Sequence, residues 1–256
     1  MAEVPNRTIK RGLTMLELLG AHPEGLALCE LAEALNLPRS TAFNLAHTLT
    51  RLDYAWYNED TGKYALGLKM FEIGSSAINR IDVMKVVRGA MAQIHREVNE
   101  TMHLGIASDR EMLYIDKMES TRSIRMSSYV GSRAPLYCTA LGKAVLSTMR
   151  DEQVTKMYRH TILQAMTPRT ITSVPLLIEQ LALIRQKGYA VEREEYNEGV
   201  CCAAVALRDG EGRAVYALSV SAPVFRVGEA EFEHYAELLL IAQQRIERFL
   251  KGGQTK

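Results

Sequence analysis

The sequence feature that most limits the fold lies at residues 26–52, where two short amphipathic patterns are separated by a tight break. In the first pattern Leu28, Leu31 and Leu35 recur at the spacing of one helix face. Pro38 then interrupts the pattern. Proline cannot continue a helix but suits the first position of a new one. The sequence therefore predicts two short helices joined by a turn, as in a helix-turn-helix.

The second of these helices is predicted to carry a polar row on its exposed side. Its apolar face comprises Ala42, Leu45, Ala46, Leu49 and Leu52. The row outside this face comprises Arg39, Ser40, Thr41, Asn44 and Thr48. Such side chains donate to and accept from base edges and phosphates, which indicates DNA recognition. A solvated helix in an ordinary helical bundle is the alternative at this point.

The segments on either side extend this pair into a larger unit. Residues 7–20 have apolar residues at helical spacing, namely Ile9, Leu13, Leu16 and Leu19, which predicts a helix packed under the pair. Residues 54–66 place two aromatic-rich runs around turn residues, which predicts a β-hairpin. Its aromatic residues Tyr54, Trp56 and Tyr64 are expected to cover the helical core.

Three helices followed by a hairpin is the order of a winged helix-turn-helix and strengthens the DNA-binding interpretation. We expect phosphate contacts from the cations outside the recognition helix, namely Arg7, Arg11 and Lys63. The formal net charge of the chain is only +1, so affinity for DNA should depend modestly on salt.

Composition fits a globular protein of one large or two modest domains. The chain has 256 residues, of which 47% are hydrophobic and 24% charged. No apolar run approaches the roughly 20 residues of a membrane span, and the N-terminus lacks the apolar region of a signal peptide, so we expect a cytoplasmic protein without membrane partners. The four cysteines form no CxxC pair, which predicts reduced thiols.

The remaining pattern predicts a second, α+β domain. A linker helix is expected over residues 68–82, with further helices over 83–98, 151–159, 174–187 and 229–250, and strands over 102–107, 112–118, 123–129 and 189–195. The expected domains are a winged helix-turn-helix at 1–67, the linker helix at 68–82 and an antiparallel sheet flanked by helices at 83–256. The fold class is thus α/β in the broad sense, of the α+β kind.

Two features of the second domain indicate a ligand site. Thr139 is positioned to cap a helix, and the unpaired amides that follow such a cap favour anions. A symmetric hairpin turn at residues 209–212 would place Cys202 opposite Ser219 and Val200 opposite Ser221 on one face. Small polar side chains among apolar ones suit a cavity for a small polar ligand, although they can also simply fill a crowded core.

Over nearly its whole length the chain resembles the IclR family of bacterial transcription regulators. The resemblance is carried by LNLPRSTAFNLAHTL, GKYALGLKMFEIG, APLYCTALGKAVL and GYAVEREEYNEGVCCAAVALRDGEG, in this order. It implies a winged-helix domain, a linker helix, a GAF-like effector domain, no cofactor and no catalysis. It also implies homodimers or homotetramers on palindromic double-stranded operator DNA.

The resemblance further implies an effector pocket and a ligand class. Matching pocket positions are Met126, Ala134, Ala140, Leu141, Glu192, Val200, Cys202, Ser219 and Ser221. Residues 122–143, together with residues 168–173, look most like regulators of sugar-acid breakdown of the 2-keto-3-deoxygluconate type. Asn44 stands where many relatives have arginine, which moves the favoured base from guanine towards adenine.

The sequence thus predicts a ligand-responsive regulator of a catabolic operon with a small carboxylate as effector. A repressor is the first choice for its mode of action. An activator of the same fold is the main alternative. A cysteine-dependent enzyme built on Cys202 or Cys138 would need a partner base, and the six histidines occur in no recognisable partnership with either cysteine. A further alternative makes Cys201 and Cys202 a redox sensor or, with Glu192, part of a metal site; reactive thiols need cationic neighbours, whereas the nearby chain is acidic.

Overall fold

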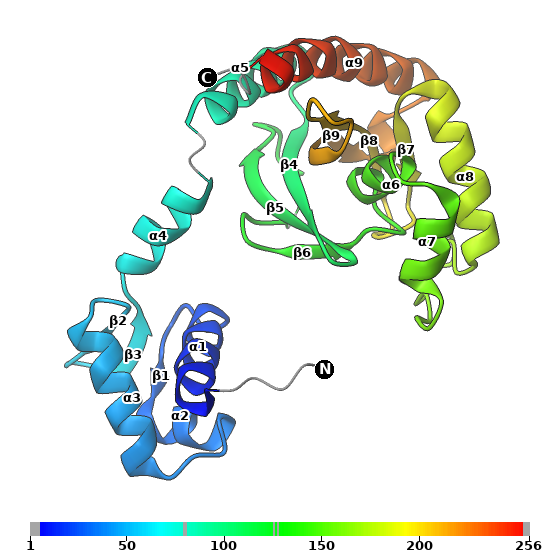
Figure 1. The fold of residues 1–256 in the computed structure, drawn as a ribbon. Coiled ribbons are helices and arrows are strands. Elements are labelled where there is room, and N and C mark those ends of the chain that lie inside the picture. Colours follow the sequence, from blue (N-terminus) through cyan, green and yellow to red (C-terminus); the bar gives the residue numbers. More distant parts are fainter. Residues whose placement is uncertain (1–5, 79–80, 125, 127, 253–256) are drawn as a thin grey trace. The chain divides into compact units, whose positions relative to one another are not determined.

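The computed structural model describes residues 6–78, 81–124, 126 and 128–252 (Figure 1). The chain divides into two compact units, Met1–Ile81 and Asp82–Lys256. Each unit is organised around its own hydrophobic clusters. None of the helices in the described residues is long and apolar enough to cross a membrane.

The first unit is a helix-turn-helix with a small sheet. Its elements are α1 (Arg7–Gly20), β1 (Leu26–Ala27), α2 (Leu28–Ala34), α3 (Arg39–Arg51), β2 (Ala55–Asn58), β3 (Lys63–Leu66) and α4 (Lys69–Ile78). The strands pair in the order β1-β3-β2. Met15, Leu19, Leu31, Ala42 and Tyr64 are central to its core. The predicted helices, turn and hairpin are confirmed. The linker helix predicted over residues 68–82 is described to Ile78, residues 79–80 lie outside the described residues, and residues 81–82 belong to the next helix, α5 (Ile81–Val98), instead of interrupting the chain as predicted.

Several details of this unit differ from the sequence prediction. Leu26 and Ala27 form a short strand beside β3. Pro38 takes the cap position of α3, so that Arg39 is its first helical residue. Leu52 follows the end of α3 and is 56% exposed, outside the apolar face predicted for it. Trp56 is 49% exposed, because it neighbours buried Ala55 and faces the opposite side of β2. Ile9 and Leu13 are also exposed.

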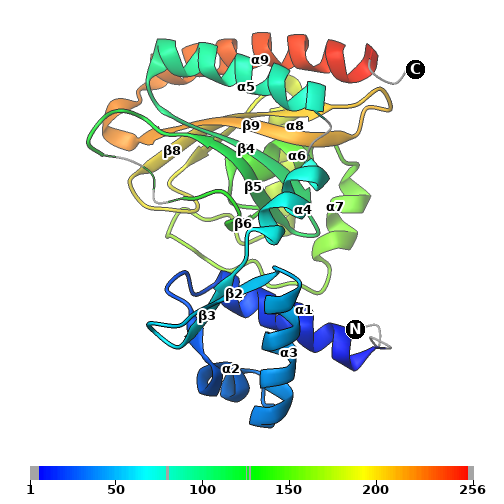
Figure 2. The same ribbon diagram turned by 90° about the vertical axis from the view of Figure 1, so that its left-hand side faces the viewer.

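The second unit is a six-stranded antiparallel sheet between two helical layers. Its elements are α5 (Ile81–Val98), β4 (Thr101–Ser108), β5 (Glu111–Met118), β6 (Arg133–Pro135), α6 (Ala140–Ser147), α7 (Asp151–Tyr158), α8 (Val174–Lys187), β7 (Ala190–Arg193), β8 (Val200–Arg208), β9 (Ala214–Pro223), η1 (Val224–Arg226) and α9 (Glu229–Gly252). The strand order is β6-β5-β4-β9-β8-β7. Helices α5 and α9 cover one face, and α6, α7 and α8 lie on the other (Figures 1 and 2).

Alternation along β8 shows how the sequence supplies both faces. Cys201, Ala203 and Val205 pack towards α5 and α9, whereas Ala204 and Ala206 pack in the cluster of α6 and α8. Cys202 belongs to this second face and is partly exposed. Sequence patterning of this kind predicts a sheet that is buried on both sides, as observed.

The register of the β8–β9 hairpin differs by two residues from the symmetric one. Cys202 lies opposite Ser221, and Ala204 lies opposite Ser219. The turn holds one extra residue, and within it the amide of Asp209 donates to the carbonyl of Arg213 at 2.9 Å. An irregularity in the pairing between Leu207 and Arg208 shifts the register by the second residue. A shift of two leaves every side chain on its face, so the predicted pairs are wrong but the grouping holds.

The strand predicted over residues 123–129 is also wrong in its described part, and Arg125 and Ser127 lie outside the described residues. The free edge of β5 is taken by β6 instead, where Met112 pairs with Ala134. Side-chain and backbone contacts hold residues 119–124 in an irregular path. Because the described part of this segment does not pair with a strand, it is available to line a cavity.

Gly142 allows α6 to start close to the segment that follows β6. A Cβ atom at Gly142 would lie 2.2 Å from the backbone of Leu136, which cannot yield as a flexible side chain would. We expect Gly142→Ala to lower the free energy of unfolding by about 1–3 kcal/mol, through overpacking. Urea titration followed by circular dichroism measures this.

Gly89 is the matched control, because it lies in α5 and a Cβ atom added there would meet open space. Gly89→Ala should raise stability by about 0.5–1 kcal/mol. Equal effects of the two substitutions would contradict the close contact of α6.

Candidate functional site

A cavity of about 730 Å³ lies on the face of the sheet that carries α6. Its floor comes from β4, β7, β8 and β9, and one wall comes from the start of α6. Its rim comes from η1, residues 196–199, and Ile124, Met126, Ser128, Tyr129, Ser132 and Arg133. Prominent lining residues are His103, Tyr114, Met126, Ser128, Thr139, Glu192, Tyr196, Cys202, Ser219, Ser221 and Phe225. This volume suits a small-molecule ligand.

Sheet pairing aligns polar side chains across the cavity floor. Glu192 on β7 lies opposite Cys202 on β8, which lies opposite Ser221 on β9. On β4, His103 lies opposite Ser219 and reaches Ser221 diagonally, with 3.3 Å between Nδ1 and Oγ. The Cys202 thiol donates to Ser221 Oγ at 3.1 Å, and His103 Nε2 is 2.7 Å from Ser128 Oγ. Glu192, Cys202, Ser221, His103 and Ser128 are called the polar row below.

Burial sets the protonation of this polar row. It raises the pKa of Glu192 to about 7, against the opposing effect of amide hydrogen bonds from Glu195 and Tyr196. Burial, with the charge of Lys117, lowers the pKa of His103 to about 3. Burial and Glu192 raise the pKa of the Cys202 thiol well above its usual value. At neutral pH the imidazole and the thiol are therefore uncharged.

These shifts oppose cysteine chemistry in the cavity. A nucleophilic cysteine needs a thiolate and a partner base, whereas His103 reaches Cys202 only through Ser221. Burial also raises the pKa of Cys138 to about 12. Among the described residues, no cluster of three or more histidine, cysteine and acidic side chains is arranged to hold a metal ion.

The start of α6 supplies hydrogen-bond donors at the cavity wall. Thr139 caps the helix, as predicted, by accepting from the amide of Gly142 at 3.2 Å. The amides of Ala140 and Leu141 precede it, and both residues line the cavity. The first amides of a helix have no partner within it, and the helix dipole favours an anion in front of them. This wall is suited to an oxyanion.

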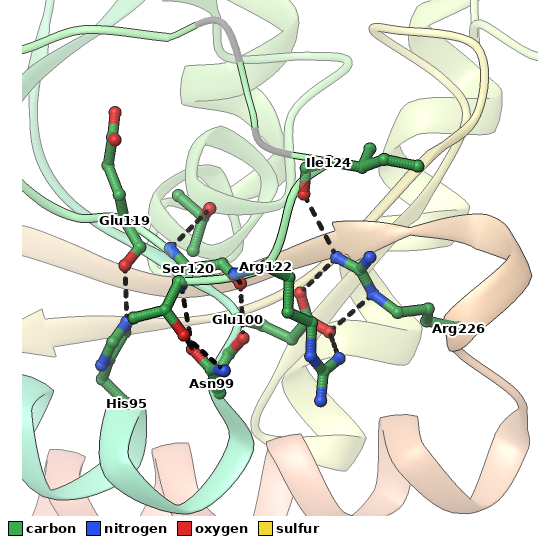
Figure 3. Close-up of polar contacts among 10 residues, drawn as sticks. His95, Asn99, Glu100, Glu119, Ser120, Arg122, Ile124 and Arg226 are labelled. Atoms are coloured by element: carbon green, nitrogen blue, oxygen red, sulfur yellow. Dashed lines mark hydrogen bonds and ion pairs between the residues drawn. The ribbon is translucent and has the colours of Figure 1, made fainter.

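Two cavity-lining segments are tied to the junction of α5 and β4 (Figure 3). Glu100 is 1% exposed and accepts two hydrogen bonds of 2.9 Å from Arg226, the last residue of η1, and another from Arg122. Arg226 also donates to the carbonyl of Ile124, which lines the cavity. His95, near the end of α5, bonds the carbonyl of Glu119 at 2.8 Å. One buried carboxylate thus links both segments to the end of α5.

The structure brings eight of the nine predicted pocket residues to this cavity. They are Met126, Ala140, Leu141, Glu192, Val200, Cys202, Ser219 and Ser221. Ala134 does not line it, because it is buried on β6 opposite Met112. Sequence reasoning missed His103, Tyr114 and Ser128. His103 falls within a predicted strand, but no sequence signal pairs that strand with β9.

The structure exposes most of the predicted DNA-contacting side chains. Arg7, Arg11, Arg39, Ser40, Asn44 and Thr48 are exposed, whereas Thr41 and Lys63 are half-buried. The Thr48 hydroxyl donates to the carbonyl of Asn44 at 2.7 Å. Phe43, 46% exposed, stacks on His47 with 5.6 Å between ring centroids. The exposed side of α3 is therefore mixed polar and aromatic.

Known proteins match both units of the chain. Residues 8–59 match the family model for the IclR helix-turn-helix domain, and residues 75–248 match that for the C-terminal domain of the bacterial transcriptional regulator IclR. The transcriptional regulator KdgR of Escherichia coli is 33% identical over 91% of this chain and 88% of its own length. The regulator XynR of the same organism is 32% identical over 95% and 97%.

Solved structures agree with these sequence matches. IclR of Thermotoga maritima has a TM-score of 0.80 at 30% identity, covering 95% of this chain and 98% of its own. A Microbacterium hydrocarbonoxydans homologue in complex with 4-hydroxybenzoate has a TM-score of 0.85 at 21% identity, covering 95% and 98%, and shows the fold alone. With family models across both units, this chain belongs to the IclR family, whose members are transcriptional regulators rather than enzymes.

Proposed function

We propose that this regulator is a cytoplasmic repressor of a catabolic operon whose effector is a small carboxylate, with sugar acids the first candidates. The observation that carries the ligand class is the cavity, in which a polar floor faces the capped start of α6. Hydroxyl-bearing acids match both features, because the helix start favours an anion and the floor offers hydrogen-bond partners. The resemblance of residues 122–143 and 168–173 to sugar-acid regulators supports the same class.

On the DNA side, the exposed side of α3 is the reading surface. Arg39, Ser40, Thr41, Asn44 and Thr48 lie along it, and Arg7, Arg11 and Lys63 contact phosphates. Two or four copies on a palindromic operator would place two such helices in successive major grooves. Residues 1–67 form the DNA-binding domain, 68–82 the linker helix and 83–256 the effector domain.

The effector acts by favouring one arrangement of the linker helix. A ligand changes DNA affinity only to the extent that it binds one conformation better than the other. Within the second unit, Glu100 joins the cavity-lining residues Ile124 and Phe225 to the end of α5 by way of Arg226. A thermal-shift screen of sugar acids, pyruvate and 4-hydroxybenzoate, followed by operator-shift assays, tests the class. No stabilisation by any acid would overturn it.

Asn44→Ala tests base reading by α3. The carboxamide is suited to bidentate bonding with adenine, so its loss should cost about 1–3 kcal/mol on the cognate operator while non-specific binding changes little. Electrophoretic mobility shift with cognate and scrambled duplexes measures both. Arg7→Ala is the control, since loss of a phosphate contact should weaken both duplexes alike. Equal losses for Asn44→Ala would rule out its reading role.

A Ser219→Ala, Ser221→Ala double variant tests the cavity. Both side chains are buried, and loss of their hydrogen bonds should weaken effector binding by about 1–3 kcal/mol. Operator affinity without effector should remain, but release by effector should be lost. Ser147→Ala, at the far end of α6, should behave as wild type. An unchanged response in the double variant would place the effector elsewhere.

Glu192 makes carboxylate binding dependent on pH. Because its pKa is raised to about 7, it is mostly protonated at pH 6 and mostly ionised at pH 8. The ionised form repels a carboxylate in the same cavity, so affinity should fall as pH rises above 7, by at most about tenfold per pH unit. Calorimetric titration at pH 6, 7 and 8 measures this, and Glu192→Gln should remove the slope. Affinity that rises with pH would contradict the assignment.

A further inference from the structure

His103, like Ser128, belongs to the polar row but is not among the predicted pocket positions. It lies on β4, is 4% exposed and packs its ring against Tyr114, with 5.0 Å between centroids. Both ring nitrogens have hydroxyl partners, Ser221 at Nδ1 and Ser128 at Nε2. This buried imidazole therefore connects two different segments of the cavity, β9 and the segment that holds Ser128.

The hydrogen bonds of the polar row have a direction. The Cys202 thiol donates to Ser221 Oγ, which leaves the hydroxyl hydrogen of Ser221 for the lone pair of His103 Nδ1. A neutral imidazole has one donor and one acceptor, so we assign His103 the tautomer whose hydrogen is on Nε2 and is donated to Ser128 Oγ. Ser128 lines the cavity and, as the acceptor, keeps its own hydrogen available for a ligand.

Another residue already holds the backbone around Ser128. The buried Lys117 ammonium donates to the carbonyls of Ser128 at 2.5 Å and Met126 at 3.0 Å. The segment therefore does not depend on His103 for its position. What the His103 bond adds is the orientation of one hydroxyl group.

We propose that His103 is a specificity-determining residue that turns the Ser128 hydroxyl hydrogen towards the ligand. Because this rests on the cavity being the effector site, it deepens the proposed function. The chemistry selected is a ligand with an oxygen acceptor, a hydroxyl or carboxylate group, at the Ser128 end of the polar row. An apolar ligand end leaves the donor unpaired in a buried site, which costs affinity.

Two variants of His103 distinguish a role in ligand selectivity from a role in side-chain packing. His103→Phe keeps a ring beside Tyr114 but removes both hydrogen bonds, whereas His103→Gln keeps one donor and one acceptor. The probes are D-gluconate, D-galacturonate and hexanoate, which has the carbon number of the sugar acids without their hydroxyls. Calorimetry gives the affinities, and operator-shift assays without ligand report the basal state.

Wild type should bind a sugar acid more tightly than hexanoate. His103→Phe should lower the affinity for a sugar acid by about 10- to 100-fold, and should leave the affinity for hexanoate and the basal operator affinity within about twofold. The selectivity ratio, which is the affinity for a sugar acid divided by that for hexanoate, should therefore fall by a similar factor. His103→Gln should restore part of it. Ser128→Ala, a smaller change, should repeat the loss.

These measurements distinguish failure of the role of His103 from failure of the proposed effector class. If wild type binds neither sugar acid, the ligand class fails and the role of His103 fails with it. If wild type binds a sugar acid, and Ser219→Ala with Ser221→Ala weakens it, but His103→Phe and Ser128→Ala leave the selectivity ratio unchanged, only the role of His103 is overturned. Equal losses for all three probes would show a packing role and also overturn it.

Discussion

The pairing of β7, β8, β9 and β4 is the constraint on which the cavity depends. Side chains alternate between the two faces of a sheet, so a shift of the pairing by an odd number of residues moves a side chain to the other face. Glu192, Cys202 and Ser221 therefore share a face only in the observed register or in one shifted by an even number of residues. The opposite face buries Cys201, Ala203 and Val220 against α5 and α9. A one-residue slip would bury the polar groups in that apolar layer and open the apolar ones to the cavity. Hydrophobic burial thus fixes the position of the polar row.

Burial also decides what chemistry this polar row can offer. Desolvation raises the pKa of Glu192 and Cys202 and lowers that of His103, so each group moves towards its neutral form. Neutral donors and acceptors suit the recognition of hydroxyl groups, while the start of α6 favours an anion. The same desolvation removes the thiolate on which a cysteine enzyme would depend.

Local patterns made most of the fold predictable, because helices and hairpins are encoded over short distances. The helices at 7–20 and 174–187 were placed at their observed bounds. The β8–β9 pairing was predicted two residues away from its true register, since an irregularity near Arg208 has no marker in the sequence. His103 was missed for another reason: β4 pairs with β9 more than a hundred residues later, and periodicity does not identify such partners.

The irregular segment 119–124 shows why failure of a pattern can be informative. The strand predicted over residues 123–129 begins within this segment, but the hydrogen-bonding groups of residues 119–122 are used by the end of α5 and by Glu100 instead of a neighbouring strand (Figure 3). A strand in a buried sheet is paired along its whole length, whereas this segment is held by a few side chains, from Glu119 to the carbonyl of Ile124, where it reaches the cavity. Because Glu100 is buried and binds arginines from two cavity-lining segments, movement of either one is resisted unless the other follows. Such shared anchoring favours discrete arrangements over gradual deformation, which is the property that a ligand-responsive regulator requires.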